Sequence, residues 1–346
     1  MEQKWRSFLI QAGAVFKNDS VLYFRGSREK LAALPNTIIT DLSHLGLIAI
    51  AGEEARVFLQ NLLTNDIREV NDQRSQLTGL CNPKGRLFAI FQLFQWNTHF
   101  YLSLPHSILE STLKRLSIYI LRTRVSLIND SDHYCRFGLA GLQADNMLAQ
   151  LLNITPLTAN EVYQTPNLCI IRMPDQLPRF EIMGEFNFIQ ELWNELKKAA
   201  DPVGTRIWEL LTIRAGIARI YPETQELFIP QQVNLELSGG VSFTKGCYPG
   251  QEIIARMHYR GKPSRRMLLA YILTDKPPKP ADPLYVSNNN DKEHVGEIVA
   301  AESTLDGGYD SLVVLHTASL EKGEIVLNNE MKSKLIFQKL PYEVPL

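Results

Sequence analysis

The chain has 346 residues, of which 45% are hydrophobic, and it carries 36 basic against 37 acidic side chains. This length exceeds one ordinary hydrophobic core, so we expect two or three domains. The balanced charge excludes a general electrostatic attraction of the whole protein to nucleic acid or membranes. A local basic patch could still bind either of them. The longest apolar stretches, such as Leu87–Phe94, are too short to span a bilayer, and Met1–Ile10 lacks the continuous apolar segment of a signal peptide. We therefore expect a soluble, cytoplasmic protein.

The first part of the chain alternates apolar runs with amphipathic segments. Leu47–Ile50 predicts a strand, and Gly52 turns the chain into a helix over Glu53–Leu63. Further elements follow from repeats of two residues in strands and 3.6 residues in helices. The predicted strands are Arg86–Trp96, His99–Leu104, Arg124–Ile128, Arg136–Ala140 and Leu168–Met173, and the predicted helices are Ser107–Leu121, Phe188–Lys198 and Ile207–Ile217.

The pattern changes after Pro263. Short strand-like runs alternate there with turn signals at Lys276–Pro278, Asn288–Asp291 and Asp306–Gly308, which is typical of a small β-barrel or sandwich. The predicted strands are Met267–Leu273, Val295–Ala301, Ser311–Leu315 and Glu324–Leu327. The whole pattern predicts an α+β protein with a C-terminal β domain and a boundary near residues 262–266.

The four cysteines are widely spaced. Cys81, Cys135, Cys169 and Cys247 are separated by 54, 34 and 78 residues, and the sequence contains no C-x-x-C pair. The spacing therefore lacks the usual zinc or ferredoxin pattern, and no metal site is predicted. In a chain without a signal segment, we expect free thiols rather than a disulfide framework.

The segment Thr244–Glu252 carries the strongest chemical signal. Gly246 and Gly250 bracket Cys247, and glycine permits positive φ and close approach of a ligand. Such a loop would present the thiol, and the nearby cation of Lys245 would favour its reactive thiolate form. The alternative, weighted equally, is a tight turn before a helix or strand that begins at Gln251.

The sequence Lys245-Gly246-Cys247-Tyr248-Pro249-Gly250-Gln251-Glu252 resembles the signature of the YgfZ family, which includes a mitochondrial branch for iron–sulfur assembly. The resemblance covers most of the chain after about residue 40. It extends through Ala215–Ile217, Phe228–Gln231, Asn234-Leu235, Ala255-Arg256, Arg260-Gly261, Arg265 and Leu340–Tyr342, and more weakly through Ile50–Gly52, Leu59-Gln60 and Cys81–Arg86. It implies a folate-binding accessory protein that supports iron–sulfur cluster assembly or repair, tRNA processing and tRNA modification.

The family in turn resembles the folate-binding T protein of the glycine cleavage system. That likeness implies an α+β, three-lobed body around a central opening that binds tetrahydrofolate or a derivative, with a C-terminal β-barrel. It divides the chain into an N-terminal extension at residues 1–40, two interleaved folate-binding-like α+β domains at residues 41–262, and the barrel at residues 263–346.

The resemblance also implies site residues. Cys247 with its neighbour Lys245 would be the functional thiol, and Trp208 and Arg256 would contact folate, although Trp208 also suits a hydrophobic core. Gly246, Tyr248, Gly250, Gln251 and Glu252 are carried over as motif residues. The second tryptophan of the family is replaced by Leu45. One cysteine cannot hold a cluster alone, so Cys247 would be at most a transient ligand shared with an iron–sulfur enzyme, an assembly factor or a small thiol.

Catalysis of aminomethyl transfer is not expected. The catalytic aspartate of the aminomethyltransferases corresponds to Phe88–Phe91, which contains no acid to handle a proton at the folate nitrogen. A folate-dependent one-carbon transferase is accordingly only an alternative to the accessory function. A non-catalytic binding module is a second alternative.

A basic run follows the motif. It comprises Arg256, Arg260, Lys262, Arg265 and Arg266, and no acidic residue occurs from Ile253 through Thr274. The run could bind the glutamate tail of folate or phosphates of RNA, or it could be a solvated face. His258 is of interest because it follows Cys247 closely.

Overall fold

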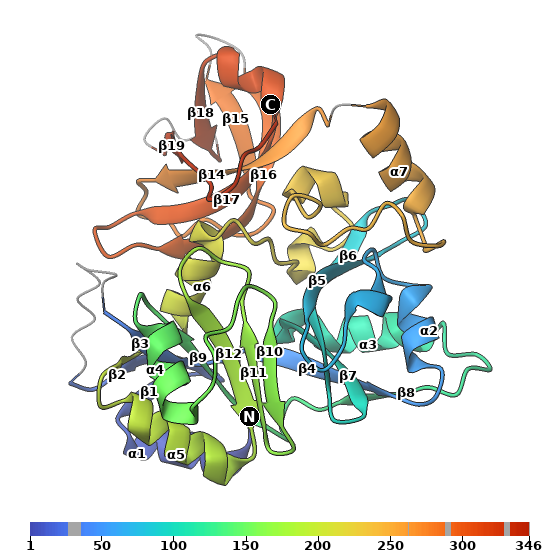
Figure 1. Ribbon diagram of the computed structural model, residues 1–346. Coiled ribbons are helices and arrows are strands. Elements are labelled where there is room, and N and C mark those ends of the chain that lie inside the picture. The colour runs from blue at the N-terminus through green and yellow to red at the C-terminus, as the bar shows by residue number, and fades with distance from the viewer. Residues whose placement is uncertain (27–35, 262, 288–291, 329–332, 346) are drawn as a thin grey trace. The chain divides into compact units, whose positions relative to one another are not determined.

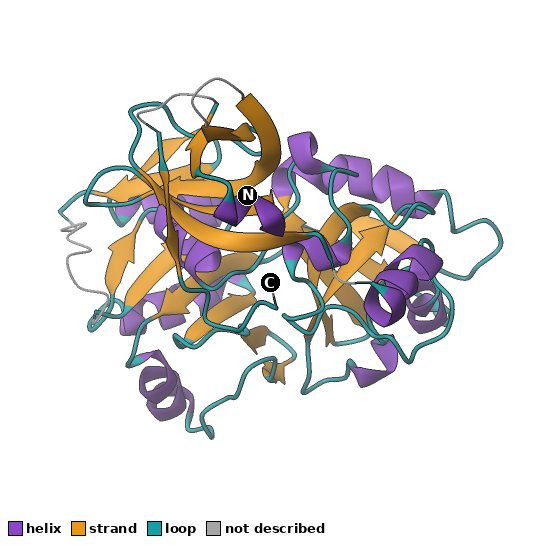
Figure 2. Ribbon diagram, turned by 90° about the horizontal axis from the view of Figure 1, so that it is seen from above, coloured by secondary structure: helices purple, strands orange, loops and turns teal. Residues whose placement is uncertain are grey.

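The computed structural model describes residues 1–26, 36–261, 263–287, 292–328 and 333–345. Lys262 and the predicted turn at Asn288–Asp291 lie outside these residues. The protein combines helices with sheets (Figure 2), as predicted for an α+β protein. The chain forms two compact units. The first comprises residues 1–58, 67–76 and 92–208, and the second comprises residues 59–66, 77–91 and 209–346. The three-part division by residue number stays a prediction.

The first unit contains a six-stranded sheet with the strand order β10-β11-β12-β9-β3-β13. Its strands are β3 (Ile38–Asp41), β9 (Cys135–Ala140), β10 (Val162–Thr165), β11 (Leu168–Arg172), β12 (Arg179–Gly184) and β13 (Asp201–Val203). Side chains alternate between the two faces of a strand. Phe137 and Phe180 accordingly join a hydrophobic core on one face, whereas Arg136 and Glu181 point to the other.

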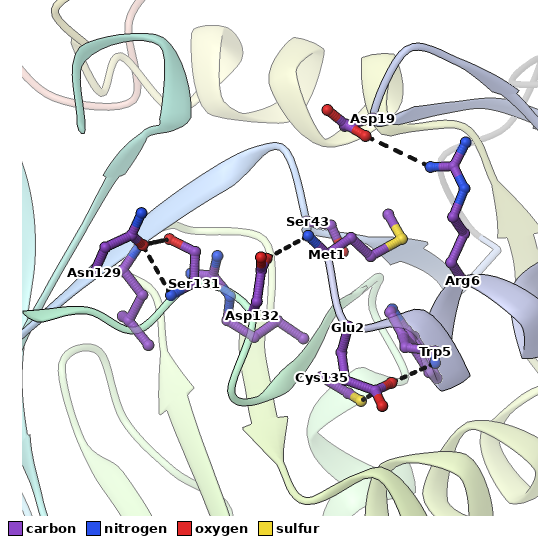
Figure 3. Close-up of polar contacts among 12 residues, drawn as sticks. Met1, Glu2, Trp5, Arg6, Asp19, Ser43, Asn129, Ser131, Asp132 and Cys135 are labelled. Carbon is purple, nitrogen blue, oxygen red and sulfur yellow. Dashed lines mark hydrogen bonds and ion pairs between the residues drawn. The ribbon is translucent and has the colours of Figure 1, made fainter. Parts of the chain in front are cut away.

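Three helices complete that core, namely α1 (Gln3–Gln11), α4 (Ala144–Leu152) and α5 (Phe186–Leu196). Trp5 of α1 stacks on Phe137 at 6.4 Å and meets Trp193 of α5 edge-on at 5.4 Å. The Glu2 carboxylate caps α1 by accepting a hydrogen bond from the Trp5 amide, and it also accepts one from Cys135 Sγ at 3.9 Å (Figure 3). These contacts, with the hairpin of β1 (Ala14–Lys17) and β2 (Ser20–Phe24), make the N-terminal segment part of the first unit.

A five-stranded sheet has the order β5-β6-β7-β4-β8. Its strands are β4 (Leu45–Ala51), β5 (Gln76–Cys81), β6 (Leu87–Trp96), β7 (His99–Pro105) and β8 (Ser126–Asn129), and the nearby helices are α2 (Ala55–Gln60) and α3 (Leu109–Ser117). Both helices are shorter than predicted. Leu63 leaves α2 because it pairs with Leu80 in a β-bridge, and Leu121 has a φ of 22°, which is incompatible with a helix.

The second unit contains a C-terminal six-stranded sheet with the order β18-β15-β16-β17-β14-β19. The strands are β14 (Arg265–Ile272), β15 (Pro283–Ser287), β16 (Lys292–Ser303), β17 (Tyr309–His316), β18 (Glu324–Leu327) and β19 (Leu335–Gln338). A bridge between Val326 of β18 and Lys334, directly before β19, brings the two edges together, so the sheet nearly closes (Figure 1). This confirms the predicted C-terminal β-barrel.

The remaining helices connect these layers. They are α6 (Thr205–Arg214), α7 (Gln251–Arg260) and the short 3₁₀ helices η1 (Ile67–Glu69), η2 (His106–Ile108), η3 (Pro222–Thr224), η4 (Pro230–Val233) and η5 (Thr317–Glu321). Among the described residues, no helix has the length and apolar character needed to cross a bilayer.

Candidate functional site

The thiol of Cys247 is exposed in a loop of the second unit, directly before α7. Cys81, Cys135 and Cys169 are buried. Burial raises the pKa of all three buried thiols, that of Cys135 to about 12. Since the thiolate is the nucleophile and the soft metal ligand, Cys247 is the cysteine placed to react from solution.

Lys245 fastens this loop to another part of the second unit. Its Nζ donates hydrogen bonds to the main-chain carbonyls of Gln60 at 2.6 Å, Leu63, and Asn65 at 3.1 Å. The side chain is 5% exposed, and its ammonium lies 4.9 Å from the ring centroid of Tyr248. These contacts make Lys245 a structural anchor, and its effect on the thiolate of Cys247 stays a prediction.

Gly250 has a backbone conformation that favours glycine, whereas Gly246 does not. Gly250 has a φ of 80°, and a Cβ atom there would lie 2.5 Å from Cα of Gly85 and 2.6 Å from the carbonyl oxygen of Asn82. The turn at Cys81–Arg86 thus packs directly against the cysteine loop. Gly246 has no positive φ, and a Cβ atom there would meet nothing within 4 Å. The positive φ expected at both glycines is therefore present at Gly250 and absent at Gly246.

The segment that begins at Gln251 is the helix α7, which settles the choice between helix and strand. Gly250 is its N-cap residue, and the exposed Glu252 in the first turn places a negative charge near the positive end of the helix dipole. Gln251 Nε2 donates to the Lys245 carbonyl at 3.5 Å. Tyr248 is 7% exposed, and burial raises the pKa of its hydroxyl. Most of the motif therefore builds the loop and starts the helix, and Cys247 remains on its surface.

The basic run does not form one surface. Arg265 donates to His316 Nε2 at 2.9 Å and pairs with Glu297 at 3.3 Å. Arg266 is 4% exposed and forms an ion pair with Glu236. In contrast, Arg256 and Arg260 are exposed on α7. Neighbouring carboxylates thus neutralise the last two arginines of the run, and Arg266 is not part of a solvated face.

Trp208 lies in the core of the first unit, with 0% of its surface exposed. A Cβ atom at Gly138 of β9 would lie 2.5 Å from the indole, so the ring packs directly against that strand. The guanidinium of Arg179 lies 4.9 Å from the ring centroid. Trp208 is thus a core residue in this structure, and stacking of its indole on folate stays a prediction. Trp208 and Arg256 belong to different units.

Sequence reasoning missed a charged pocket inside the first unit. Its lining includes Leu47, Phe94, Ser103, Arg136, Glu181 and Met183. Arg136 and Glu181 share one face of the sheet because Arg136 pairs with Met183 and Glu181 pairs with Gly138. The available signal was Arg136 in an otherwise apolar β9, with Arg179 and Glu181 in β12.

The Arg136 guanidinium in this pocket is strongly desolvated. Burial lowers the pKa of the Arg136 guanidinium, whereas the nearby Glu181 carboxylate opposes that shift. Arg136 donates a hydrogen bond to the Leu45 carbonyl. Glu181 is 9% exposed, and none of the described residues gives its carboxylate a hydrogen bond or an ion pair. A buried carboxylate in that state favours a ligand that donates hydrogen bonds.

Known proteins resemble this chain over most of its length. The family profile of the GCVT N-terminal domain matches residues 14–174. The tRNA-modifying protein YgfZ of Colwellia psychrerythraea is 27% identical over 315 residues, covering 90% of this chain and 95% of that protein. The chain is similar to the YgfZ proteins over most of its length. The YgfZ protein of Escherichia fergusonii is 29% identical over 307 residues, covering 89% of this chain and 90% of that protein.

A solved structure shows the same fold as this chain. The glycine cleavage system aminomethyltransferase T from Bartonella henselae superposes with a TM-score of 0.75, over 97% of this chain and 96% of that one. The two sequences are 17% identical, so the likeness establishes the fold alone. It confirms the predicted fold, which is like that of the glycine cleavage T protein.

Proposed function

We propose that the protein is a folate-binding accessory protein that supports tRNA modification, and that its exposed thiol at Cys247 serves the assembly or repair of iron–sulfur clusters. The observation that carries the folate part is the Glu181 carboxylate, which has no hydrogen-bond partner among the described residues and lines a pocket of the first unit. The GCVT N-terminal domain match covers part of that lining, including Leu47 and Ile171. The names of the homologues, tRNA-modifying proteins, support the role in tRNA modification.

The chemistry of the pocket suits the pterin ring of tetrahydrofolate. The amino and ring N–H groups of a pterin form a pair of donors, and a carboxylate can accept two parallel hydrogen bonds. The apolar side chains of Leu47, Phe94 and Ile171 offer walls for the ring faces. The open space is narrow, with room for about one water molecule. Binding therefore requires side chains to move, and the flexible Met183 in the lining is suited to do so.

The second part of the proposal concerns the thiol. Cys247 is exposed, and thiolates are good ligands for iron and other soft metals. A single cysteine supplies one of the four ligands that a cluster usually needs. Contact with a cluster is therefore transient, and the partner enzyme, an assembly factor or a small thiol supplies the other ligands.

Aminomethyl transfer is not part of the proposal. Phe88, Ala89, Ile90 and Phe91 are buried apolar residues of β6, so this segment offers no carboxylate for acid–base chemistry at a folate nitrogen. In this view the bound folate has a structural or regulatory role, and the protein works in the cytoplasm.

Two measurements test the two parts separately. Calorimetric titration with tetrahydrofolate should show binding to the wild type that Glu181→Gln weakens and Glu191→Gln, an exposed change on α5, leaves intact. Complementation of a strain that lacks its YgfZ protein should succeed with the wild type and fail with Cys247→Ser. Unchanged folate affinity in Glu181→Gln would contradict the first part, and full complementation by Cys247→Ser would contradict the second.

A further inference from the structure

Three aromatic rings contact one another on α7 and in the loop before it. Phe243 and His258 are stacked, with ring centroids 3.7 Å apart and planes 13° apart. Tyr259 meets both rings edge-on, at 6.3 Å from Phe243 and 4.8 Å from His258. Tyr259 is 67% exposed, so the cluster presents a ring to solvent instead of filling a core.

Two exposed arginines lie on the same helix as two of these rings. Arg256 is three residues before Tyr259 and four before Arg260, so it neighbours both on the helix surface, whereas His258 lies two residues from each arginine and faces another side. Within the described residues, neither arginine has a hydrogen-bond or ion-pair partner. Glu252 is the one acidic residue in the sequence of α7 and lies in its first turn, and the Glu236 carboxylate near His258 is already paired with Arg266. The unpaired charge beside Tyr259 is therefore positive.

We propose that Phe243, His258 and Tyr259, together with Arg256 and Arg260, form a platform that binds unpaired bases of single-stranded RNA. Bases stack on exposed aromatic rings, and arginines neutralise the phosphates that connect them. An acidic protein partner would account for the arginines but not for an exposed cluster of rings. The bases of a duplex are already stacked on one another, so a duplex does not fit this surface.

The position of the platform deepens the proposed function. Phe243 belongs to the same loop as the exposed Cys247, four residues earlier in the sequence. Gly246, between them, leaves open space beside the backbone, since a Cβ atom there would meet nothing within 4 Å. The choice of RNA over DNA rests on the proposed role in tRNA modification, whereas the stacking mode rests on the rings alone.

Fluorescence anisotropy with a 5′-labelled single-stranded RNA of twelve mixed nucleotides tests the platform. Tyr259→Ala should weaken binding about 5- to 100-fold, the effect of losing one base-stacking partner, whereas Tyr259→Phe keeps the ring and should bind as the wild type does. The double variant Arg256→Gln/Arg260→Gln should reduce the slope of log K against log salt by about 1.4. Phe188→Ala, a change of another exposed aromatic residue on α5, and Arg122→Gln should leave binding unchanged.

The choice of nucleic acid is tested in the same assay. The single strand should bind more tightly than a duplex RNA of the same sequence, and at least as tightly as the corresponding DNA strand. Wild-type affinity in Tyr259→Ala, tighter binding of the duplex, or tighter binding of the DNA strand would overturn the proposal. Such a failure is distinguishable from failure of the proposed function, because folate titration of Glu181→Gln and complementation by Cys247→Ser involve none of the platform residues.

Discussion

The Cα atom of Gly85 occupies space that any side chain at Gly250 would need, since a Cβ atom on Gly250 would lie 2.5 Å from it. The two glycines belong to segments 165 residues apart in the sequence, the turn at Cys81–Arg86 and the loop that carries Cys247. Their contact fixes the start of α7 against that turn. Gly250 is therefore required by packing as well as by its φ of 80°.

Replacement of Gly250 should be costly for stability. We expect Gly250→Ala to lower the free energy of unfolding by about 2–4 kcal/mol, from a left-handed φ and an overpacked contact together. Gly239 has a φ of 72° but open space around it, so Gly239→Ala should cost about 1 kcal/mol through φ alone. Gly246→Ala should stay within about 0.5 kcal/mol of the wild type. Urea titration measures all three, and equal losses in the three variants would contradict the packing argument.

Lys245 provides a second prediction about the same loop. Lys245→Met keeps the length of the side chain but removes the donors to the carbonyls of Gln60, Leu63 and Asn65. We expect a loss of about 1–3 kcal/mol in the free energy of unfolding, because these acceptors lose a charged donor. A loss under about 0.5 kcal/mol would contradict the anchoring role. The pH midpoint of Cys247 alkylation tests the other role, since an alkaline shift in the variant would show that the ammonium also favours the thiolate.

The local pattern of the sequence predicts much of this fold. The strands β6, β7 and β18 follow apolar runs or two-residue alternation that any sheet requires. The anchoring of Lys245 could not be predicted, because its acceptors are main-chain carbonyls about 180 residues earlier and leave no trace in the residue types. Charge alone also misled the interpretation of Arg265 and Arg266, whose acidic partners come from distant segments.

The charged pocket was missed for a similar reason. Glu181 lies in β12, a strand that the sequence analysis did not predict, and becomes a neighbour of Gly138 only when β12 pairs with β9. Trp208 illustrates the opposite case, since its residue type suits both a ligand platform and a core. Burial decides between these, and burial depends on the packing of Gly138 beneath the ring.

The four thiols should differ in reactivity in the folded protein. Burial raises the pKa of Cys81, Cys135 and Cys169, so these stay protonated at pH 8 and are also shielded from reagents. We expect brief iodoacetamide treatment at pH 8 to label Cys247 first, with peptide mapping as the measurement. In denaturant all four should react at similar rates, which is the control. Preferential labelling of a buried cysteine in the native protein would contradict the assignment.

Trp208 should behave as a core residue. Trp208→Ala removes a fully buried indole and should lower the free energy of unfolding by about 3–5 kcal/mol. Trp208→Phe retains a ring against Gly138 and should cost less. Denaturant titration measures both changes. A nearly neutral Trp208→Ala would show that the indole contributes little packing and would revive its interpretation as a ligand contact.

The Glu181 carboxylate offers the sharpest test of folate binding, because glutamine removes its charge and keeps its shape. Glu181→Gln keeps the size of the side chain but replaces one acceptor oxygen with a donor, which faces the N–H groups of a pterin unfavourably. Loss of a charge-assisted hydrogen bond is worth about 1.5–3 kcal/mol, so tetrahydrofolate should bind roughly 10- to 150-fold more weakly. The buried Arg136 guanidinium loses a nearby negative charge in this variant, so we expect a loss of up to about 3 kcal/mol in the free energy of unfolding. Calorimetry measures the affinity and denaturant titration the stability. Weaker folate binding by the folded variant assigns Glu181 to the ligand, whereas a loss of stability with unchanged affinity would assign it to the fold alone, through its attraction to Arg136.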